Sequence, residues 1–248
     1  MVAQPQTRAD EIKAIHREYK TFYQIAVRVF LVGIGVLIGI IWFSSDLDRS
    51  AYIVNLFTTF LGTLATVLVI DFLNRRRDDQ RELRQLQEQL VRDAGSTSNE
   101  IAKNAVHQLQ KRGWLEGDTG LLQGAHLGSA NLQGVDLIGA NLQEANLFLT
   151  NLQEANLYLA NLQRAILFIT NLQGANLSST NLQGAHLGSA NLQGVDLTFA
   201  KLQGANLIGT NLQGAKVNRA QMDETTILPD RSRWTPDTDL TKFGCIVE

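Results

Sequence analysis

Few residues in this sequence have the type and spacing that catalysis or metal binding requires. The 248-residue chain contains one cysteine, Cys245, and four histidines. A single cysteine excludes an internal disulfide and a cysteine-based zinc site. No nucleophile elbow, glycine-rich phosphate loop or metal-ligand spacing occurs. We therefore expect a protein that is not an enzyme and that uses no cofactor or metal.

Two of the histidines, His126 and His186, lie in identical copies of one segment, GAHLGSANLQGVDL, at 124–137 and 184–197. A unique active site is not normally duplicated, so we do not expect either histidine to be catalytic. The 60-residue spacing instead indicates growth of the chain by duplication.

Two apolar stretches predict a transmembrane helical hairpin. Residues 25–43 contain one charge and residues 51–70 contain none, and each stretch meets the roughly 20-residue length that a bilayer requires. Seven residues, SSDLDRS, separate them. A buried soluble hairpin or a cleaved signal peptide fits these lengths less well.

Polar and small residues inside the two spans are spaced for contact between helices. Small and hydroxyl side chains let membrane helices approach closely, so we expect them to pack within the hairpin or between protomers. An ion path is the alternative, which two helices could line only in an oligomer. The residues concerned are Gly35, Gly39, Asn55, Thr59, Thr63 and Thr66.

The basic residues around the spans predict the orientation of the hairpin. Arg49 is the only basic residue in the connecting turn, whereas nine basic residues flank the two outer ends. Basic residues favour the cytoplasmic side, so we expect both termini in the cytoplasm. The nine are Arg8, Lys13, Arg17, Lys20, Arg75, Arg76, Arg77, Arg81 and Arg84.

Residues 74–113 predict a charged helical connector. Leu83, Leu86 and Leu90 form a narrow apolar seam, and Gly95 suits a helix end. The segment 97–100, TSNE, has the pattern of a capping box that opens a second helix. We expect either two helices that turn back on each other or one helix that leaves the membrane and then turns; a short coiled coil between protomers would use the same leucines.

From residue 125 to residue 229 the chain repeats every five residues, in 21 pentads. The central residue is Leu in 18 of them, and the residue two places earlier is Ala, Thr or Val in all. An α-helix advances about 500° in five residues and a flat strand alternates faces, so neither keeps such a repeat on one side. The chain must turn by a fixed angle in every pentad, which is the geometry of a solenoid.

The units ANLQG, ANLFL, TNLQE and VDLIG resemble the A-(D/N)-L-x-x units of pentapeptide-repeat proteins. The resemblance covers residues 120–229 and implies a right-handed quadrilateral parallel β-helix with four pentads per coil. It also implies that the central Leu and the preceding small residue point inward. The tail TTILPDRSRWTPDTDL is similar to a common ending of such domains, in which Pro229 would stop the ladder and Trp234 would cover its end.

These boundaries divide the chain into five expected parts. They are a cytoplasmic N-terminal segment (1–21), a transmembrane helical hairpin (22–73), a charged helical connector (74–119), the pentapeptide-repeat β-helix (120–229), and a C-terminal cap and tail (230–248).

In a 20-residue coil, residues 20 apart in the sequence lie above one another. Two columns of glutamines then face solvent. They could form ladders of hydrogen-bonded amides, or they could equally be surface residues that bond only to water. They are Gln133, Gln153, Gln173, Gln193 and Gln213, and on the opposite face Gln143, Gln163, Gln183 and Gln203.

The same arithmetic gathers apolar residues at outward positions. On one face Phe168 lies above Phe148 and Ile169 lies above Leu149. Beside them Ile166 replaces the usual asparagine. The opposite face holds a second group, Tyr158 and Leu159 with Ile138 and Phe199. Contiguous exposed apolar patches mark interfaces, although aromatic stacking along the ladder would also explain them.

The charge balance of the repeat argues against a nucleic-acid-related function. Residues 120–229 carry six acidic and four basic residues. Some pentapeptide-repeat proteins imitate DNA with a strongly acidic face, which this balance does not provide. We expect no nucleic-acid partner. The leading hypothesis is a non-enzymatic scaffold, held in the lipid bilayer, whose cytoplasmic β-helix binds a protein partner or another copy of the chain. The alternative is a subunit of a transport or channel assembly.

Overall fold

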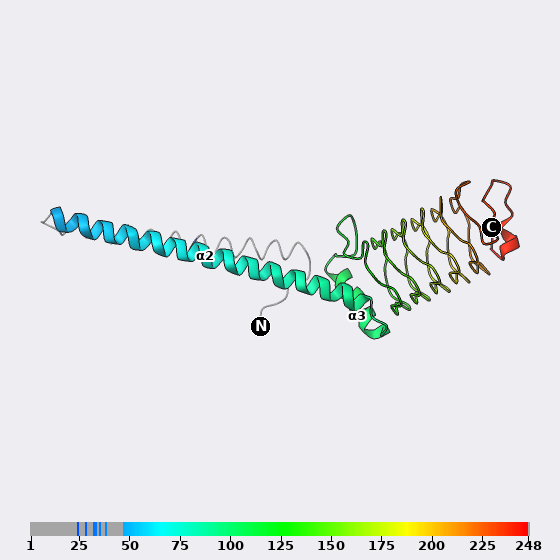
Figure 1. Cartoon of the computed structure of the whole chain (residues 1–248), viewed down its shortest axis with the longest axis horizontal. Coiled ribbons are helices and arrows are strands. Elements are labelled where there is room, and N and C mark those ends of the chain that lie inside the picture. Colours follow the sequence, from blue (N-terminus) through cyan, green and yellow to red (C-terminus); the bar gives the residue numbers. More distant parts are fainter. Residues whose placement is uncertain are drawn as a thin grey trace. The chain divides into compact units, whose positions relative to one another are not determined.

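The computed structural model of the chain describes residues 24, 28, 32, 33, 35, 38 and 47–247. The chain divides into two compact units, Met1–Gln85 and Leu86–Glu248 (Figure 1). Most of the first predicted span therefore lies outside the described residues, and so does Gly39.

Helix α2 runs without interruption over Leu47–Ala94, 48 residues. It includes the second apolar stretch and the first half of the predicted connector, so the two are one helix. Within the described residues one helix, Val54–Ala94, is long and apolar enough to cross a membrane, which by itself is weak support for a membrane span. After the apolar stretch, charged residues resume at Asp71, which pairs with Arg75 at 2.8 Å.

One side of α2 packs against Gly33, a residue of the first apolar stretch. A Cβ placed on Gly33 would lie 3.0 Å from Leu61 Cδ1 and 3.5 Å from Phe57 Cε1, so the absence of a side chain there permits the close approach. The half-buried residues of α2 follow the same side with spacings of three and four, as expected for one helix face. They are Val54, Phe57, Leu61, Leu64 and Leu68.

Helix α3, Asn99–Lys111, begins where the sequence predicts, but the capping box does not form. The Ser98 side chain accepts no capping hydrogen bond. Instead Asn99 Nδ2 donates to the carbonyl oxygens of Asn131 and Gln133, both at 3.1 Å. Ala102, Ala105, Val106 and Leu109 are buried, so α3 covers the core at the first coil of the repeat.

The repeat forms a solenoid of 20-residue coils. Parallel bridges join residues 20 apart on all four sides of each coil, as in Asn131↔Asn151, Asp136↔Asn156, Asn141↔Asn161 and Asn146↔Ile166 (Figure 1). The pentad centres from Leu127 to Leu207 are at most 1% exposed, so one continuous leucine column fills the interior. The pentapeptide-repeat β-helix is thereby confirmed, while its right hand and the two-helix hairpin remain predictions.

Buried threonines at the small inward position connect successive coils. Thr150 Oγ1 donates to Leu127 O at 2.8 Å, and Thr170 Oγ1 donates to Leu147 O at 2.7 Å. A buried hydroxyl needs such a partner, and here the backbone of the preceding coil supplies it.

An amide ladder exists, but asparagine forms most of it. Asn151, Asn171, Asn191 and Asn211 each donate from Nδ2 to Oδ1 of the asparagine 20 residues earlier, at 3.2–3.4 Å. Among the glutamines of the described chain, side-chain bonds join Gln163 to Gln183 and Gln203 to Gln221. The shorter Asn side chain is also held by the backbone N–H two residues later, as in Gln153 N to Asn151 Oδ1 at 3.1 Å, which fixes it in the ladder.

The register slips by one residue near the end of the repeat. The pentad period predicts Ile227 at an inward centre, but Thr226 and Leu228 are the residues at 0% exposure. Asn206 pairs with Ile227, a separation of 21 instead of 20. Asp223 accounts for the extra residue, because its carboxylate accepts hydrogen bonds from the N–H groups of Gly204 and Thr225 and so holds a wider turn.

The ladder does not end at Pro229. After the short 3-10 helix η1, Leu240–Phe243, the chain returns, and Lys216 pairs with Ile246 in a parallel bridge. Cys245 is buried at 7% exposure, and burial raises the pKa of its thiol to about 11. The C-terminal residues therefore complete the last coil.

Candidate functional site

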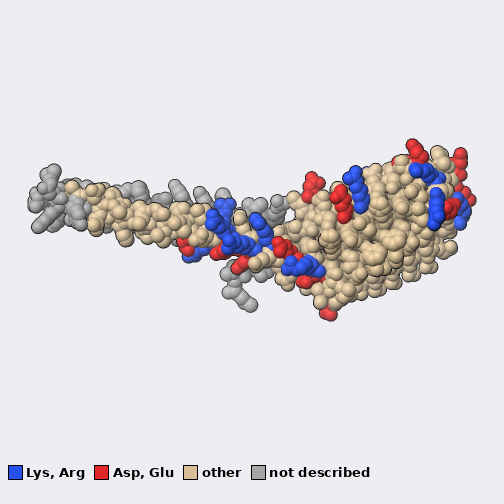
Figure 2. All heavy atoms as spheres, in the orientation of Figure 1, with Lys and Arg blue, Asp and Glu red and all other residues tan. Residues whose placement is uncertain are grey.

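One side of the solenoid carries no charged residue over five successive coils; the next coil ends in Asp230, which pairs with Lys242 at 3.0 Å. We call it the Phe face and define it by residues 125–129, 145–149, 165–169, 185–189 and 205–209. These five pentads contain no Asp, Glu, Lys or Arg, and their titratable side chains are His126 and His186. The solenoid as a whole is sparsely charged on the side visible in Figure 2.

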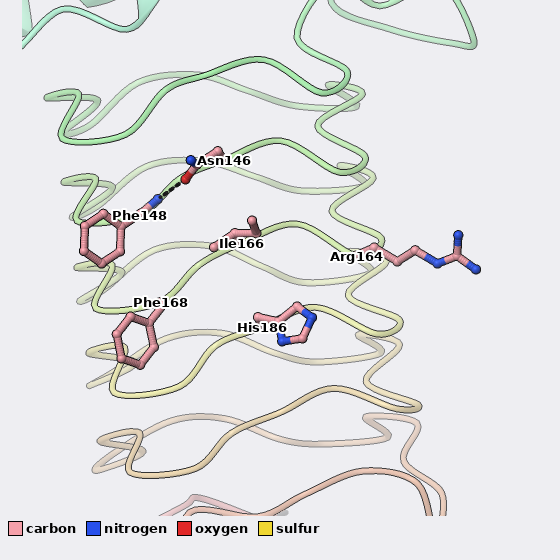
Figure 3. Close-up of a pocket in the computed structure, with 6 residues that line it drawn as sticks. All are labelled: Asn146, Phe148, Arg164, Ile166, Phe168 and His186. Carbon is pink, nitrogen blue, oxygen red and sulfur yellow. Dashed lines mark hydrogen bonds between the residues drawn. The ribbon is translucent and has the colours of Figure 1, made fainter.

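Two aromatic rings form the centre of the Phe face (Figure 3). Phe148 and Phe168 are stacked, with centroids 6.1 Å apart and planes 7° from parallel. They remain 37% and 43% exposed. Phe168 also lies over the bare backbone of Gly188, since a Cβ there would come within 3.1 Å of the ring. The rings thus lie on the surface, and the leucine core does not include them.

Ile166 lies beside the rings and cannot form the hydrogen bond that an asparagine forms at this position. In the preceding coil, Asn146 Oδ1 accepts the N–H of Phe148 at 3.0 Å. Ile166 occupies the equivalent position before Phe168 and has no side-chain oxygen to accept that hydrogen bond. It is 41% exposed, so burial in the core does not compensate for the lost bond.

The apolar residues at the corner of this face occupy strained backbone positions. Leu149 has a φ of 58° and Ile169 a φ of 56°. Glycine favours this left-handed region, and a β-branched residue there is a genuine outlier. Ile169 is nevertheless 43% exposed, so it incurs strain without a core contact in return. The last residue of each pentad from Gly124 to Arg219 has a positive φ, so the turn belongs to the repeat, and it is the β-branched side chain at this position that adds strain.

Replacing Ile169 by glycine should therefore stabilise the protein. The change relieves about 1–2 kcal/mol of left-handed strain and loses about 0.5–1 kcal/mol because glycine is more flexible when unfolded. We expect a net gain of about 0.5–1 kcal/mol in the free energy of unfolding, measured by urea denaturation. Ile138→Gly is the control: Ile138 does not have a positive φ, so this change should lose stability. Equal losses in both variants would contradict the strain argument.

A shallow open hollow lies next to the two rings. Its lining consists of Asn146, Phe148, Arg164, Ile166, Phe168 and His186 (Figure 3). Arg164 points away from the rings at the edge of the hollow, where it lies 3.7 Å from the Glu144 carboxylate. The hollow can accept apolar side chains of a partner but does not enclose a small molecule.

The predicted apolar residues of the opposite face form a looser group. Tyr158 and Leu159 are 40% and 55% exposed, and Phe199 lies two coils further on. The Arg219 guanidinium lies over the Phe199 ring, 5.4 Å from its centroid. Ser178 and Ser179 separate the two parts, so this face lacks a continuous apolar surface.

The polar residues of the predicted span bond to their own helix. Thr59 and Thr63 donate to the carbonyls of Asn55 and Thr59, at 2.8 and 2.6 Å, and Thr66 donates to Gly62 O at 2.8 Å. They lie about half a turn from the side of α2 that packs on Gly33. A Cβ placed on Gly35 would meet nothing within 4 Å among the described residues, so Gly33 is the glycine of close approach that sequence reasoning missed.

His126 and His186 are both exposed at the outward asparagine position, as the repeat predicts. Within residues 47–247, no three His, Cys, Asp or Glu side chains gather in a way that could hold a metal ion. The exposed rings of Phe148 and Phe168 offer binding through shape and apolar contact.

The coil geometry defines a β-solenoid built from five-residue units. A family model described as pentapeptide repeats matches eight copies, over residues 121–157, 130–167, 170–207 and 190–227. This chain belongs to the pentapeptide-repeat family. Proteins of this family are generally structural or protein-interaction proteins.

Solved structures of the family resemble the chain in sequence. A pentapeptide repeat protein (Rfr23) from the cyanobacterium Cyanothece 51142 is 42% identical, over 38% of this chain and 64% of that chain, with a TM-score of 0.38. A pentapeptide repeat protein from Nostoc Pcc 7120 is 37% identical, over 51% of this chain and 83% of that chain, with a TM-score of 0.35. The chain thus spans less than two thirds of the Cyanothece protein. No curated protein matches it.

Proposed function

We propose that this protein is a non-enzymatic scaffold, anchored in a membrane, that binds a protein partner through the Phe face. The observation that carries the proposal is the exposed cluster of Phe148, Ile166 and Phe168 on a face without charge. Large exposed apolar residues in contact with one another are the usual mark of an interface. The lost hydrogen bond at Ile166 and the strain at Ile169 support the same conclusion, because both reduce stability without filling the core.

The solenoid suits this role because its surface is rigid. Each coil is bonded to the next on four sides, so neighbouring side chains keep fixed spacings. A preorganised surface loses little conformational entropy when it binds. Aromatic side chains held in this way are the residues that most often dominate binding energy.

The double change Phe148→Ser and Phe168→Ser tests the proposal. We expect the circular dichroism spectrum to be unchanged and the free energy of unfolding to fall by at most about 1 kcal/mol, because the rings are exposed. Binding to the partner, or self-association, should weaken at least about tenfold. Pull-down from solubilised membranes and sedimentation in detergent measure these effects.

Tyr158→Ser with Leu159→Ser is the matched control on the opposite face. This pair is similarly exposed but should leave association intact. If the phenylalanine variant unfolds, the rings belong to the core; if neither folding nor association changes, the Phe face is not a binding surface.

Membrane anchoring and orientation form the second part of the proposal. Nine basic residues flank the outer ends of the two apolar stretches and one lies between them, so both termini should be cytoplasmic. The long apolar helix α2 supports the anchor. The packing of Gly33 against Leu61 and Phe57 supports a hairpin of two helices.

Cysteine labelling from outside the cell should give an all-or-none result. In a Cys245→Ala background, which removes the buried native thiol, a cysteine at Asp48 should react with an impermeant maleimide in intact cells. A cysteine at the exposed Asp237 should react only after the cells are opened. Reaction at Asp237 in intact cells would refute the orientation.

A further inference from the structure

We propose that the partner of the Phe face is the Phe face of a second copy of this chain, in an antiparallel two-fold arrangement. This inference rests on the proposed function of that face and names its partner. The first reason is charge: the five pentads of the face contain no Asp, Glu, Lys or Arg, and at its edge Arg164 already lies beside Glu144, so a covering partner finds no unpaired charge there. Burying an unpaired charge is costly, so the partner surface must also be uncharged and apolar.

The second reason is the order of residues along the face. Successive coils present His126-Leu-Gly-Ser129, Asn146-Leu-Phe-Leu149, Ile166-Leu-Phe-Ile169 and His186-Leu-Gly-Ser189. The two aromatic coils are adjacent, and identical coils lie on either side of them. The face therefore reads nearly the same in both directions along the solenoid.

An isologous interface requires this self-complementary order, because one patch must match itself after rotation. With the two-fold axis perpendicular to the solenoid and between the two aromatic coils, Phe148 of one copy faces Phe168 of the partner subunit. The four rings then meet at the centre. The small residues Gly128 and Ser129 face the second identical coil and leave the rings room to approach.

A parallel arrangement matches less well. It would place the column of Phe148 and Phe168 against the column of Asn146, Ile166 and His186, because rotation about the solenoid axis exchanges left and right on the face. The opposite side of the solenoid offers no equivalent surface, since Asp136, Asp196, Lys216 and Arg219 interrupt it. Antiparallel pairing of Phe faces is thus the arrangement that buries rings without burying a charge.

Cross-linking the full chain in detergent tests the geometry. Ser129 and Ser189 are exposed, have φ values of 62° and 57°, and tolerate the isosteric change to cysteine. In a Cys245→Ala background, Ser129→Cys and Ser189→Cys are purified separately, then mixed, exchanged and treated with a short bismaleimide. We expect dimers to cross-link in the mixture at least tenfold more than in either variant alone, because position 129 faces position 189 of the other copy.

One further variant completes the test. Phe148→Ser with Phe168→Ser should reduce the cross-link at least tenfold. If Ser129→Cys alone and Ser189→Cys alone each cross-link as strongly as the mixture, the antiparallel arrangement is wrong. A monomeric wild-type chain that still binds another protein through the Phe face would overturn self-association and leave the proposed scaffold standing. If the serine variant affects neither binding nor cross-linking, both proposals fail.

Discussion

Replacing Leu167 by alanine should destabilise the solenoid by about 2–5 kcal/mol, the range for buried leucines elsewhere. Leu167 is 0% exposed and lies in the middle of the leucine column. Its N–H donates to His186 O at 2.8 Å, so the backbone around it is fixed and cannot collapse into the space that the side chain leaves. The cost should therefore approach that of a full cavity.

Urea denaturation, followed by circular dichroism, measures this effect, and Gln173→Ala is the matched surface control. Gln173 lies one pentad further along, at an outward position, and its side chain is half-buried. Its replacement should change the free energy of unfolding by less than about 0.5 kcal/mol. If the two replacements destabilise the protein equally, the assignment of Leu167 to the core and of Gln173 to the surface is wrong.

The repeat allowed the core to be predicted from sequence because each pentad contributes the same two inward residues. Leucines at a strict period of five can share one side only if the chain turns in every unit, and the buried column from Leu127 to Leu207 confirms this reasoning. The same arithmetic placed Phe148 above or below Phe168 correctly, since coils of 20 residues fix the columns.

The prediction failed where one side chain, and not the period, determines the geometry. The carboxylate of Asp223 holds an extra residue in its turn, so Leu228 replaces Ile227 in the core. For the glutamines a ladder and solvated decoration were equally expected, and two bonds between glutamines occur. Asparagines form most of the ladder, because a short amide held by its own turn stays in register. No periodic pattern reports such hydrogen bonds.

For helix α2, the change in composition along the sequence did not mark the end of the helix. Sequence composition changes sharply near residue 74, from apolar to charged, yet α2 continues to Ala94. Charged residues such as Arg and Glu are good helix formers, so a change of solvent along a helix need not break it. The TSNE pattern gave the start of α3 correctly, but the solenoid backbone, not the capping box, holds Asn99.

The strain at Ile169 could not be read from the sequence, although its position could. Outward positions at the ends of pentads hold Gly, Ser or charged residues in most coils, and the large apolar exceptions are Leu149, Leu159, Ile169 and Phe199. The structure adds that the last residue of every pentad from Gly124 to Arg219 has a positive φ, so the turn is common to the repeat and a large apolar side chain in it is the exception. An apolar residue at such a position loses stability and gains exposed surface, which is the combination expected when a surface is kept for binding.

The second large effect should come from Gly120→Ala, at the segment that leads from α3 into the first coil. A Cβ on Gly120 would lie 2.5 Å from Leu115 O and 2.8 Å from Asn141 Cβ, both too close for real contacts. Leu115 O already accepts the N–H of Asn141 at 2.7 Å, so it cannot move without breaking the pairing with the first coil. We expect a loss of about 1–3 kcal/mol, as for other overpacked sites.

Gly128→Ala is the matched control, because the nearest atom to its Cβ would be Phe148 O at an ordinary 3.5 Å. It should change the free energy of unfolding by less than about 0.5 kcal/mol. Because the Gly120 clash lies against Asn141 of the first coil, the destabilisation should also appear as faster hydrogen exchange in that coil, near Leu127, than at Leu167. Equal exchange at both places would show that the first coil does not depend on this segment, and that the leucine column is stable without the cover that α3 provides.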